Sequence, residues 1–419
     1  MQAVILAAGR SSRMFPFENG IHKSMIRIMG KPILHYTIEA LKNSGIDNII
    51  IVTNGQGSIE KYFEAGQGLG VSIKYVVQEK PDGAGDALGI ADKHIEGDFI
   101  LLNASHVEVD TFVNDLLKGK KKDIKAVLLA KEKNNFAMQG MLRFSGDRVE
   151  GIIEKPKEGE EPSNVGVVGI YLLEKGFLEV LRKTPKEHYQ LESAISLYTQ
   201  TNYVSLVVTS KETVSLKYPW DLLHIKDYLF KKIKRSISNK SEIAQTAEIM
   251  GEVIVEDGVR IMEGVRIKGP CFIGKNSYIG NNALLRGGVD VGKNSVVGSY
   301  MELKNTIIME NSTTHSGFIG DSVIGENCKI AAQFCTGNVR LDRKIIAAEV
   351  RECKVLTGCK YLGVFIGEKS NIGIKVSSMP GIIIGKSVTV GPSTVVMRNI
   401  SSNTKYYTKF QEIISKKNE

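Results

Sequence analysis

The chain has 419 residues, which is enough for two or three domains that each bury a core. Hydrophobic residues make up 42% and charged residues 24% of the sequence, and this balance excludes an intrinsically disordered chain. The net charge of +9 is spread without a basic stripe, and no apolar run approaches the length of a membrane span. We therefore expect a multidomain globular protein with neither a nucleic acid nor a membrane as its partner.

Residues 1 to about 225 alternate apolar runs with helical stretches such as 33–41. The chain enters the first run directly from Met1, without the basic region and cleavage pattern of a signal peptide. Strands that alternate with helices predict an α/β domain with a mostly parallel sheet covered on both faces. The apolar runs are 4–6, 49–52, 73–77, 99–102, 126–129 and 167–172.

The loop after the first predicted strand combines small residues with positive charge. It reads Leu6-Ala-Ala-Gly-Arg-Ser-Ser-Arg-Met14, and small residues let backbone N–H groups approach an anion in such a loop. Arg13 and Lys23 add the charges that a triphosphate needs. The dinucleotide-binding pattern GxGxxG is a rival interpretation, but only Gly9 fits it, and a plain tight turn is the simplest alternative.

From Val253 the sequence falls into six-residue blocks, each with one bulky apolar residue and with Gly or Asn at the corners. This period predicts a parallel β-helix with three blocks per coil. The phase breaks between about 322 and 363 and resumes at Ile366, which predicts an inserted loop or a register shift, and the residues after Ile400 leave the repeat. The third positions are Val255, Ile261, Ile267, Ile273, Ile279, Leu285, Val291, Val297, Leu303, Met309 and His315.

The five cysteines all lie in the second half of the chain, odd in number and without a CxxC pair. We interpret them as reduced core thiols of a cytoplasmic protein. They are Cys271, Cys328, Cys335, Cys353 and Cys359.

Several motifs in chain order resemble those of the sugar-1-phosphate nucleotidylyltransferase family, whose pattern is LAAGxGxRMxP, then PK, then GKPxxxY. The matching segments cover essentially the whole first domain. They are 6–16, His22-Lys23, Gly30-Lys-Pro-Ile-Leu-His-Tyr36, Gln78 with Asp82-Gly-Ala-Gly-Asp-Ala-Leu88, Ile153-Glu-Lys-Pro156, Val168-Gly-Ile-Tyr171 and Pro219-Trp-Asp-Leu-Leu223.

With the repeat behind it, the chain resembles the archaeal two-domain enzymes that acetylate an amino-sugar 1-phosphate and couple it to UTP. The resemblance implies a Rossmann-like nucleotidyltransferase sheet followed by a left-handed parallel β-helix, which commonly trimerises. We expect a nucleotidyltransferase-like domain at 1–225, a connecting helix and linker at 226–245, the β-helix at 246–400 and a tail at 401–419.

By the same resemblance, residues of the first domain would bind a nucleoside triphosphate and a sugar 1-phosphate. Arg13 and Lys23 would contact phosphates during catalysis, in the loop that contains Gly9. Gln78 and Gly83 would contact the base, and Glu154 the sugar.

The family's metal-ligand positions depart from the pattern. Mg²⁺ is normally held by an Asp after a strand and a second Asp or Asn late in the domain, but Ser105 and Ser215 stand at these positions. A neutral hydroxyl is a poor Mg²⁺ ligand, which argues against a metal held in the family's way. Further departures from the family pattern are Ser11, His22 and Val167. Three carboxylates could replace the missing ligand, although we interpret each first as a surface acid: Asp86, Glu108 and Asp110.

In the repeat, Thr314-His-Ser-Gly-Phe-Ile-Gly-Asp-Ser322 resembles the acetyltransferase motif HxSYVGDS. His315 falls on the inward apolar phase of the repeat, where a core histidine is the usual finding. The resemblance instead implies that His315 is the general base that deprotonates the amine attacking acetyl-CoA, with Asn338 and Lys344 positioning the sugar phosphate. In this motif the residues that depart from the family pattern are Gly317 and Phe318, and in the segment that follows it Gly337 also departs.

Two hypotheses follow for the function. The first is a bifunctional transferase of nucleotide-sugar biosynthesis that acts as a sugar-1-phosphate nucleotidylyltransferase and an acetyl-CoA-dependent amino-sugar N-acetyltransferase. The alternative is a catalytically silent paralogue that binds sugar nucleotide and regulates or scaffolds an active partner. Ser105 and Ser215 are the residues that discriminate between them.

Overall fold

The computed structural model describes residues 1–18, 20–132, 140–157, 159–411 and 414. The chain divides into two compact units, and two short N-terminal segments belong to the second of them. The first unit is Met1–Ser11, Gly20–Ile26 and Lys31–Ser215; the second is Ser12–Asn19, Arg27–Gly30 and Leu216–Glu419. Within the described ranges, no helix is both long and apolar enough to cross a membrane.

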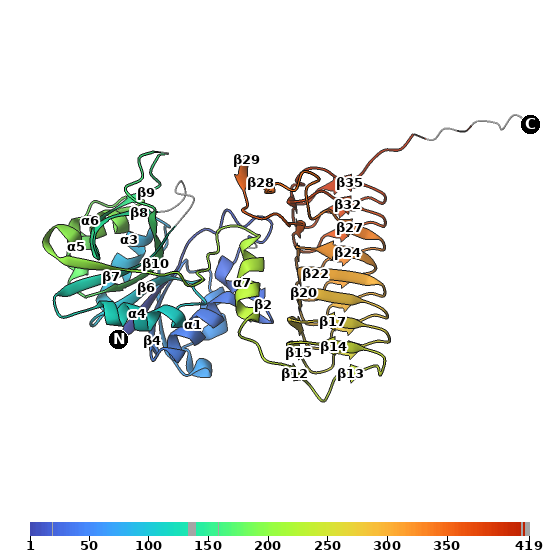
Figure 1. Ribbon diagram of the computed structural model, residues 1–419, viewed down its shortest axis with the longest axis horizontal. Helices are drawn as coiled ribbons and strands as arrows, with labels where there is room; N and C mark the ends of the chain where they lie inside the picture. Colours follow the sequence, from blue (N-terminus) through green and yellow to red (C-terminus); the bar gives the residue numbers. More distant parts are fainter. Residues whose placement is uncertain (19, 133–139, 158, 412–413, 415–419) are drawn as a thin grey trace, which may run out of the picture. The chain divides into compact units, whose positions relative to one another are not determined.

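The first unit is built on a nine-stranded sheet with the order β5-β4-β1-β6-β10-β7-β11-β9-β8 (Figure 1). The pairs β5–β4, β4–β1, β1–β6 and β7–β11 are parallel, whereas β10 runs antiparallel between β6 and β7. All six predicted apolar runs are strands of this sheet, which confirms the α/β class. The strands are β1 (Gln2–Ala7), β4 (Asn48–Thr53), β5 (Ser72–Val77), β6 (Phe99–Asn103), β7 (Ile124–Glu132), β8 (Gly140–Ser145), β9 (Arg148–Glu154), β10 (Val165–Leu173) and β11 (Tyr203–Val208).

Helices cover both faces of the sheet. Successive residues of each strand point to opposite faces, so a strand can contribute to two cores. In β1, Val4 packs in one core with residues of α3, α5 and α6, whereas Ala3 and Ile5 pack in the other with residues of α1, α2 and α4. The strands are therefore apolar throughout rather than alternating, as expected for a sheet buried on two sides. The helices are α1 (Ile33–Asn43), α2 (Ser58–Phe63), α3 (Ala84–Ala91), α4 (Asp110–Gly119), α5 (Phe177–Lys183) and α6 (Gln190–Thr201).

The second unit is a parallel β-helix preceded by α7 (Asp221–Phe230), as predicted from the six-residue period. Short parallel strands stack in three columns around one apolar core, and β20 and β22 each turn a corner between two columns (Figure 1). One column contains β12 (Ser236–Ile237), β15 (Val253–Val255), β18 (Cys271–Ile273), β20 (Leu284–Val291), β22 (Met301–Ile308), β25 (Val323–Ile324), β30 (Val364–Ile366) and β33 (Ile382–Ile384).

The other two columns complete each coil. The second contains β13 (Glu242–Ile243), β16 (Arg260–Ile261), β19 (Tyr278–Ile279), β21 (Val296–Val297), β23 (Thr313–Thr314), β26 (Lys329–Ile330), β31 (Asn371–Ile372), β34 (Thr389–Val390) and β36 (Lys405–Tyr406). The third contains β14 (Glu248–Met250), β17 (Arg266–Lys268), the first halves of β20 and β22, β24 (Gly317–Gly320), β27 (Phe334–Thr336), β32 (Ser377–Ser378) and β35 (Val395–Val396). Because β36 still pairs with β34, the repeat runs on past Ile400 to Tyr406.

The prediction that His315 faces inward is wrong. Arg286 pairs with Lys304 across 18 residues, but Val297 pairs with Thr314 across 17, so one residue has been lost from this coil. Thr314 is consequently the buried residue, and His315 lies exposed on the outside. The predicted break is an insertion, because Ile324 pairs directly with Ile366 and the extra chain forms the hairpin of β28 (Ala347–Val350) and β29 (Cys353–Leu356).

All five cysteines are free. The prediction of core thiols holds for Cys271 and Cys328, which are buried, but is wrong for Cys335 and Cys353, which are exposed. Cys335 points outward from β27 between two buried neighbours, and Cys353 begins the second strand of the inserted hairpin.

Candidate functional site

Gln78 and Gly83, the two residues expected to contact a base, lie together at the start of α3. Gln78 follows β5 and is 3% exposed; its Nε2 donates to the Gly83 carbonyl at 3.2 Å and to Asp86 Oδ2 at 2.9 Å. Gly83 has φ +114°, and a Cβ there would lie 2.5 Å from the His188 carbonyl oxygen. Only glycine fits this position, so the helix start and the Gln78 amide are held in one fixed arrangement.

The loop after β1 contains two departures that make internal hydrogen bonds. Ser11 adopts φ +54°, and its Oγ accepts the Lys23 N–H at 3.0 Å, so the hydroxyl links the start of the loop to Lys23. His22 Nδ1 lies 2.7 Å from Ser24 Oγ and accepts the Ser24 N–H at 3.3 Å. Burial, aided by the charge of Lys23, lowers the pKa of His22 to about 3, so His22 stays neutral as an acceptor. Gly9 lies exposed two residues after β1 in the same unit.

Arg13 belongs to the second unit, two residues beyond the point where the chain leaves the first. Its guanidinium carbon lies 5.7 Å from the centroid of the Tyr218 ring, within the range of a cation–π contact.

The metal-ligand positions do not form a carboxylate site. Ser105 follows β6 and is 6% exposed, whereas Ser215 is exposed. Glu108, expected to be a surface acid, is instead fully buried, and its Oε1 lies 3.0 Å from His106 Nδ1 and accepts the Val214 N–H at 3.1 Å. Its carboxylate thus joins the end of β6 to the residue before Ser215, while Oε2 is buried and has no hydrogen-bond partner within the described part of the chain.

These residues do not fit Mg²⁺. The ion prefers several oxygen ligands and retains water, but the buried Glu108 already bonds to His106 and Val214. Asp86 is held by Gln78, and Asp110 begins α4. Among the residues described here, no group of three His, Cys, Asp or Glu side chains could hold a metal ion.

Glu154, which we expect to contact the sugar, ends β9 in a half-buried position, and Glu192 is a second acid close enough to interact with it. Burial raises the pKa of Glu192, and the Glu154 carboxylate raises it further. A Cβ at Gly140 would lie 2.7 Å from Glu154 Oε2, so the glycine leaves room for this carboxylate. Val167 lies in β10 just before a register shift, where Gly169 takes φ +94°.

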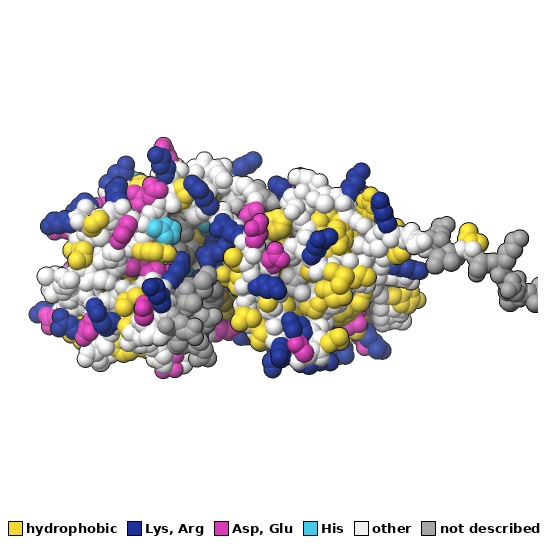
Figure 2. All heavy atoms as spheres, turned by 90° about the horizontal axis from the view of Figure 1, so that it is seen from above, with side chains coloured by type: hydrophobic (Ala, Val, Ile, Leu, Met, Phe, Trp, Pro, Cys, Tyr) yellow, Lys and Arg dark blue, Asp and Glu magenta, His cyan; other side chains and the backbone are white. Residues whose placement is uncertain are grey.

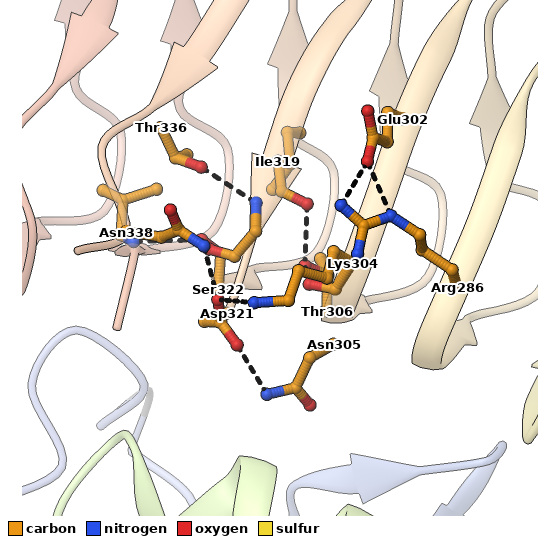
Figure 3. A network of polar contacts seen from close by, with 12 residues as sticks. Arg286, Glu302, Lys304, Asn305, Thr306, Ile319, Asp321, Ser322, Thr336 and Asn338 are labelled. Carbon is orange, nitrogen blue, oxygen red and sulfur yellow. Dashed lines mark hydrogen bonds and ion pairs between the residues drawn. The ribbon is translucent and has the colours of Figure 1, made fainter. Parts of the chain in front are cut away.

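The β-helix brings Asn338 into a network that the sequence did not reveal (Figure 3). At its centre is Asp321, 3% exposed, whose Oδ2 accepts from Lys304 Nζ at 3.0 Å and from Asn338 Nδ2 at 2.6 Å. Its Oδ1 accepts from Asn305 Nδ2 at 2.9 Å. Lys304 also lies 4.5 Å from the centroid of the Tyr361 ring.

A second cation stands directly beside this network. Arg286 pairs in register with Lys304 and bonds to Glu302 on the next coil (Figure 3). Two cations repeated at an 18-residue interval are a signal that aligning whole coils would have found. Lys344, in contrast, is exposed in the loop after Asp342, and its backbone N–H donates to the Asp342 carboxylate at 3.2 Å.

An α/β sheet covered by helices on both faces, in a chain that continues into a parallel β-helix, is typical of a two-domain class of nucleotidyltransferase-like proteins. The model of the nucleotidyl transferase family matches residues 2–245, and the chain belongs to this family. This confirms the resemblance inferred from the motifs.

The chain is also similar to proteins that have both domains. It is 32% identical over 424 residues to the "Bifunctional protein GlmU" of Methanococcus maripaludis, and 33% identical over 423 residues to that of Methanocaldococcus jannaschii, with 100% of each chain covered in both comparisons. In the fold of the first domain it resembles a solved protein of Bacillus anthracis assigned as a glucose-1-phosphate thymidylyltransferase, with a TM-score of 0.50 and 22% identity over 56% of this chain and 97% of the other.

Proposed function

We propose that the chain is a bifunctional transferase that acetylates an amino-sugar 1-phosphate and transfers a nucleotidyl group to a sugar 1-phosphate. The observation that carries this proposal is the full-length similarity to archaeal proteins named as bifunctional. The Gln78–Gly83 arrangement and the Asp321 network support it, because each offers polar groups at a place where the family's motifs predict a substrate.

For acetyl transfer, the proposed base is His315, whose exposed position on the outside of its coil leaves it accessible to acetyl-CoA. The amine of the sugar attacks the thioester carbonyl and His315 accepts the amine proton. The C–S bond then breaks, and the departing thiolate of coenzyme A takes up that proton from His315 and leaves as the thiol. Arg286 and Lys304 supply positive charge for the sugar phosphate, and Asn338 is oriented by its bond to Asp321. Lys344, exposed in its loop, is a proposed further contact.

For nucleotidyl transfer, an oxygen of the sugar phosphate attacks the α-phosphate of the nucleoside triphosphate, and pyrophosphate leaves. Lys23 and Arg13 are the proposed phosphate contacts, in the loop that contains Gly9. Both would stabilise the charge that develops on the phosphate oxygens. Gln78 and Gly83 are proposed to hold the base, and Glu154 the sugar. Since the residues at the metal positions do not fit Mg²⁺, no step is assigned to a metal.

Two assays on the purified full-length chain test the proposal. Pyrophosphate release from UTP and N-acetylglucosamine 1-phosphate, measured with Mg²⁺ and with EDTA, tests the first domain, and no release above background in either condition contradicts nucleotidyl transfer. Thiol release from acetyl-CoA and glucosamine 1-phosphate tests the second. His315→Ala should lower this rate at least 100-fold, since general base catalysis contributes about 10²–10⁴-fold. Thr313→Ala, an exposed position in β23 two residues before His315, should leave it unchanged, and an unchanged rate in His315→Ala removes the histidine from the mechanism.

We further propose that the β-helix assembles into a homotrimer. Figure 2 shows hydrophobic side chains gathered over the β-helix and edged by Lys and Arg side chains. The last coils expose large apolar residues, with Met397 70%, Val395 44% and Met379 41% exposed. Contiguous apolar surface of this kind marks an interface. Light scattering should give three times the chain mass of 46.0 kDa, and a monomer mass would contradict the trimer.

A further inference from the structure

The hairpin that interrupts the repeat is not needed to continue the β-helix. Because Ile324 pairs in register with Ile366, the coils close on each other without the inserted residues. The hairpin of β28 and β29 is fixed to the last coils by Asn399, whose Nδ2 donates to the Glu349 carbonyl at 2.9 Å and whose Oδ1 accepts the Ile383 N–H at 2.8 Å. We therefore expect this hairpin to have a role other than the stacking of coils.

The tip of the hairpin holds the segment of residues 12–18, which lies in the same unit. Arg351 stands at the tip with φ +52°, and its Nε donates to the Ser12 carbonyl at 3.3 Å. A cavity of about 460 Å³ lies between the two, lined by Ser12, Phe15 and Glu18 from the segment and by residues 349–352 from the hairpin. Burial raises the pKa of Glu18, and the charge of Arg351 opposes this rise.

The residue after Ser12 is Arg13, and it is held by the same unit. Its guanidinium lies over Tyr218, whose ring stacks on Trp220 at 4.6 Å between centroids and 11° between planes. Trp220, 3% exposed, meets Phe365 of β30 edge to face at 6.4 Å. An aromatic series thus leads from the arginine into the wall of the β-helix.

The segment of residues 27–30 is anchored in the same way. The Met29 N–H donates to Asp290 Oδ2 at 2.7 Å, and Asp290 is 2% exposed on β20. Arg27 forms an ion pair with Glu310 at 3.7 Å. The segments of residues 12–18 and 27–30 are thus each held by contacts within the second unit.

We propose that the inserted hairpin positions Arg13 for the triphosphate, with Arg351 as the positioning residue. This inference rests on the proposed nucleotidyl transfer, because Arg13 is its phosphate contact there. Holding the Ser12 carbonyl removes conformations that the loop would otherwise have to lose when a ligand binds, which raises affinity without a new contact to the ligand. By reciprocity, a bound nucleoside triphosphate orders the hairpin.

The test uses the full chain with three variants of the hairpin. Arg351→Ala removes the bond to Ser12, Arg351→Lys keeps a donor that can reach the same carbonyl, and Lys354→Ala removes an exposed cation from the other strand as a control. UTP affinity is read by calorimetry and from the emission of Trp220, the only tryptophan in the sequence. We expect Arg351→Ala to weaken UTP binding about fivefold and Arg351→Lys to recover it to within about twofold, with Lys354→Ala equal to wild type.

Two further readouts separate this role from a loss of folding and from failure of the proposed function. Thiol release from acetyl-CoA should be equal in Arg351→Ala and wild type, and amide exchange of residues 12–18 should be faster only in Arg351→Ala. Unchanged UTP affinity together with unchanged exchange overturns the positioning role. If the wild-type chain binds no UTP, the proposed nucleotidyl transfer fails and positioning for a triphosphate fails with it. The exchange measurement then decides separately whether Arg351 holds the segment.

Discussion

Lys226 in α7 provides a quantitative test of how this helix is held on the β-helix, because its side chain is fully buried. Its Nζ donates to the Gly288 carbonyl at 3.0 Å, to Asn305 Oδ1 at 2.9 Å and to Asp227 Oδ1 at 2.5 Å. Lys226→Met fills a similar volume but leaves the Gly288 and Asn305 oxygens without this donor, whereas Asp227 is 45% exposed and gains water instead. An unsatisfied buried acceptor costs about 1–3 kcal/mol, and only the Gly288 oxygen is buried while the Asn305 oxygen is part-buried, so the free energy of unfolding should fall by roughly 1–3 kcal/mol.

Urea denaturation followed by the emission of Trp220 measures this change, since Trp220 belongs to the same unit as Lys226. The matched control is Lys240→Met, which removes an exposed lysine from a surface ion pair with Asp257 and should cause no measurable change. A loss below about 1 kcal/mol in Lys226→Met would refute the reasoning, because the orphaned oxygens would then have found other donors.

Three further predictions concern the two candidate sites and the anchor between β20 and residues 27–30. Gly83→Ala should weaken UTP binding at least tenfold in calorimetry, because a Cβ there would overlap a backbone carbonyl, whereas Gly89→Ala on the same helix meets open space and should bind normally. Burial raises the pKa of Asp290 to about 7, so this carboxyl stabilises the fold fully below about pH 4 and loses that contribution as the pH rises through 7. The free energy of unfolding of Asp290→Asn, measured by urea denaturation, should therefore change less between pH 5 and pH 8 than that of the wild type. An equal change with pH in both proteins would contradict this. Asp321→Asn should raise KM for glucosamine 1-phosphate about tenfold through misplacement of Lys304 while leaving KM for acetyl-CoA unchanged; an equal rise in both constants would indicate general damage.

The fold was predictable because its signals are local, and the wrong prediction for His315 shows the limit of such signals. The six-residue period specifies the β-helix, and the runs of apolar β-branched residues specify the sheet. The lost residue near Asn305 was not visible because Ile307, Ile308 and Met309 are all apolar, so the six-residue count continues across the deletion without a break. Only the strand register reveals that the inward position has moved to Thr314.

The local structure around the candidate site residues was predictable where a motif sets the backbone and not where a distant partner decides. Gly83 lies in a motif whose turn demands glycine, and the structure places Gln78 beside it. Glu108, in contrast, is buried because it accepts a hydrogen bond from Val214, a partner 106 residues away. No local pattern distinguishes such a residue from a surface acid.

Two of the departures in the first domain, Ser11 and His22, make internal hydrogen bonds, and so does the buried Glu108 near the metal-ligand positions. Ser11 binds the Lys23 N–H, His22 caps the turn that begins at Lys23, and Glu108 joins the end of β6 to the segment that contains Ser215. Random loss of a binding site would leave polar groups without such partners, since nothing selects for their hydrogen bonds. The internal bonds instead fix the backbone of these segments within the first unit. These bonds come with a buried Glu108 oxygen that has no hydrogen-bond partner among the residues that the structure describes, an exception of the kind that folded proteins retain at functional sites.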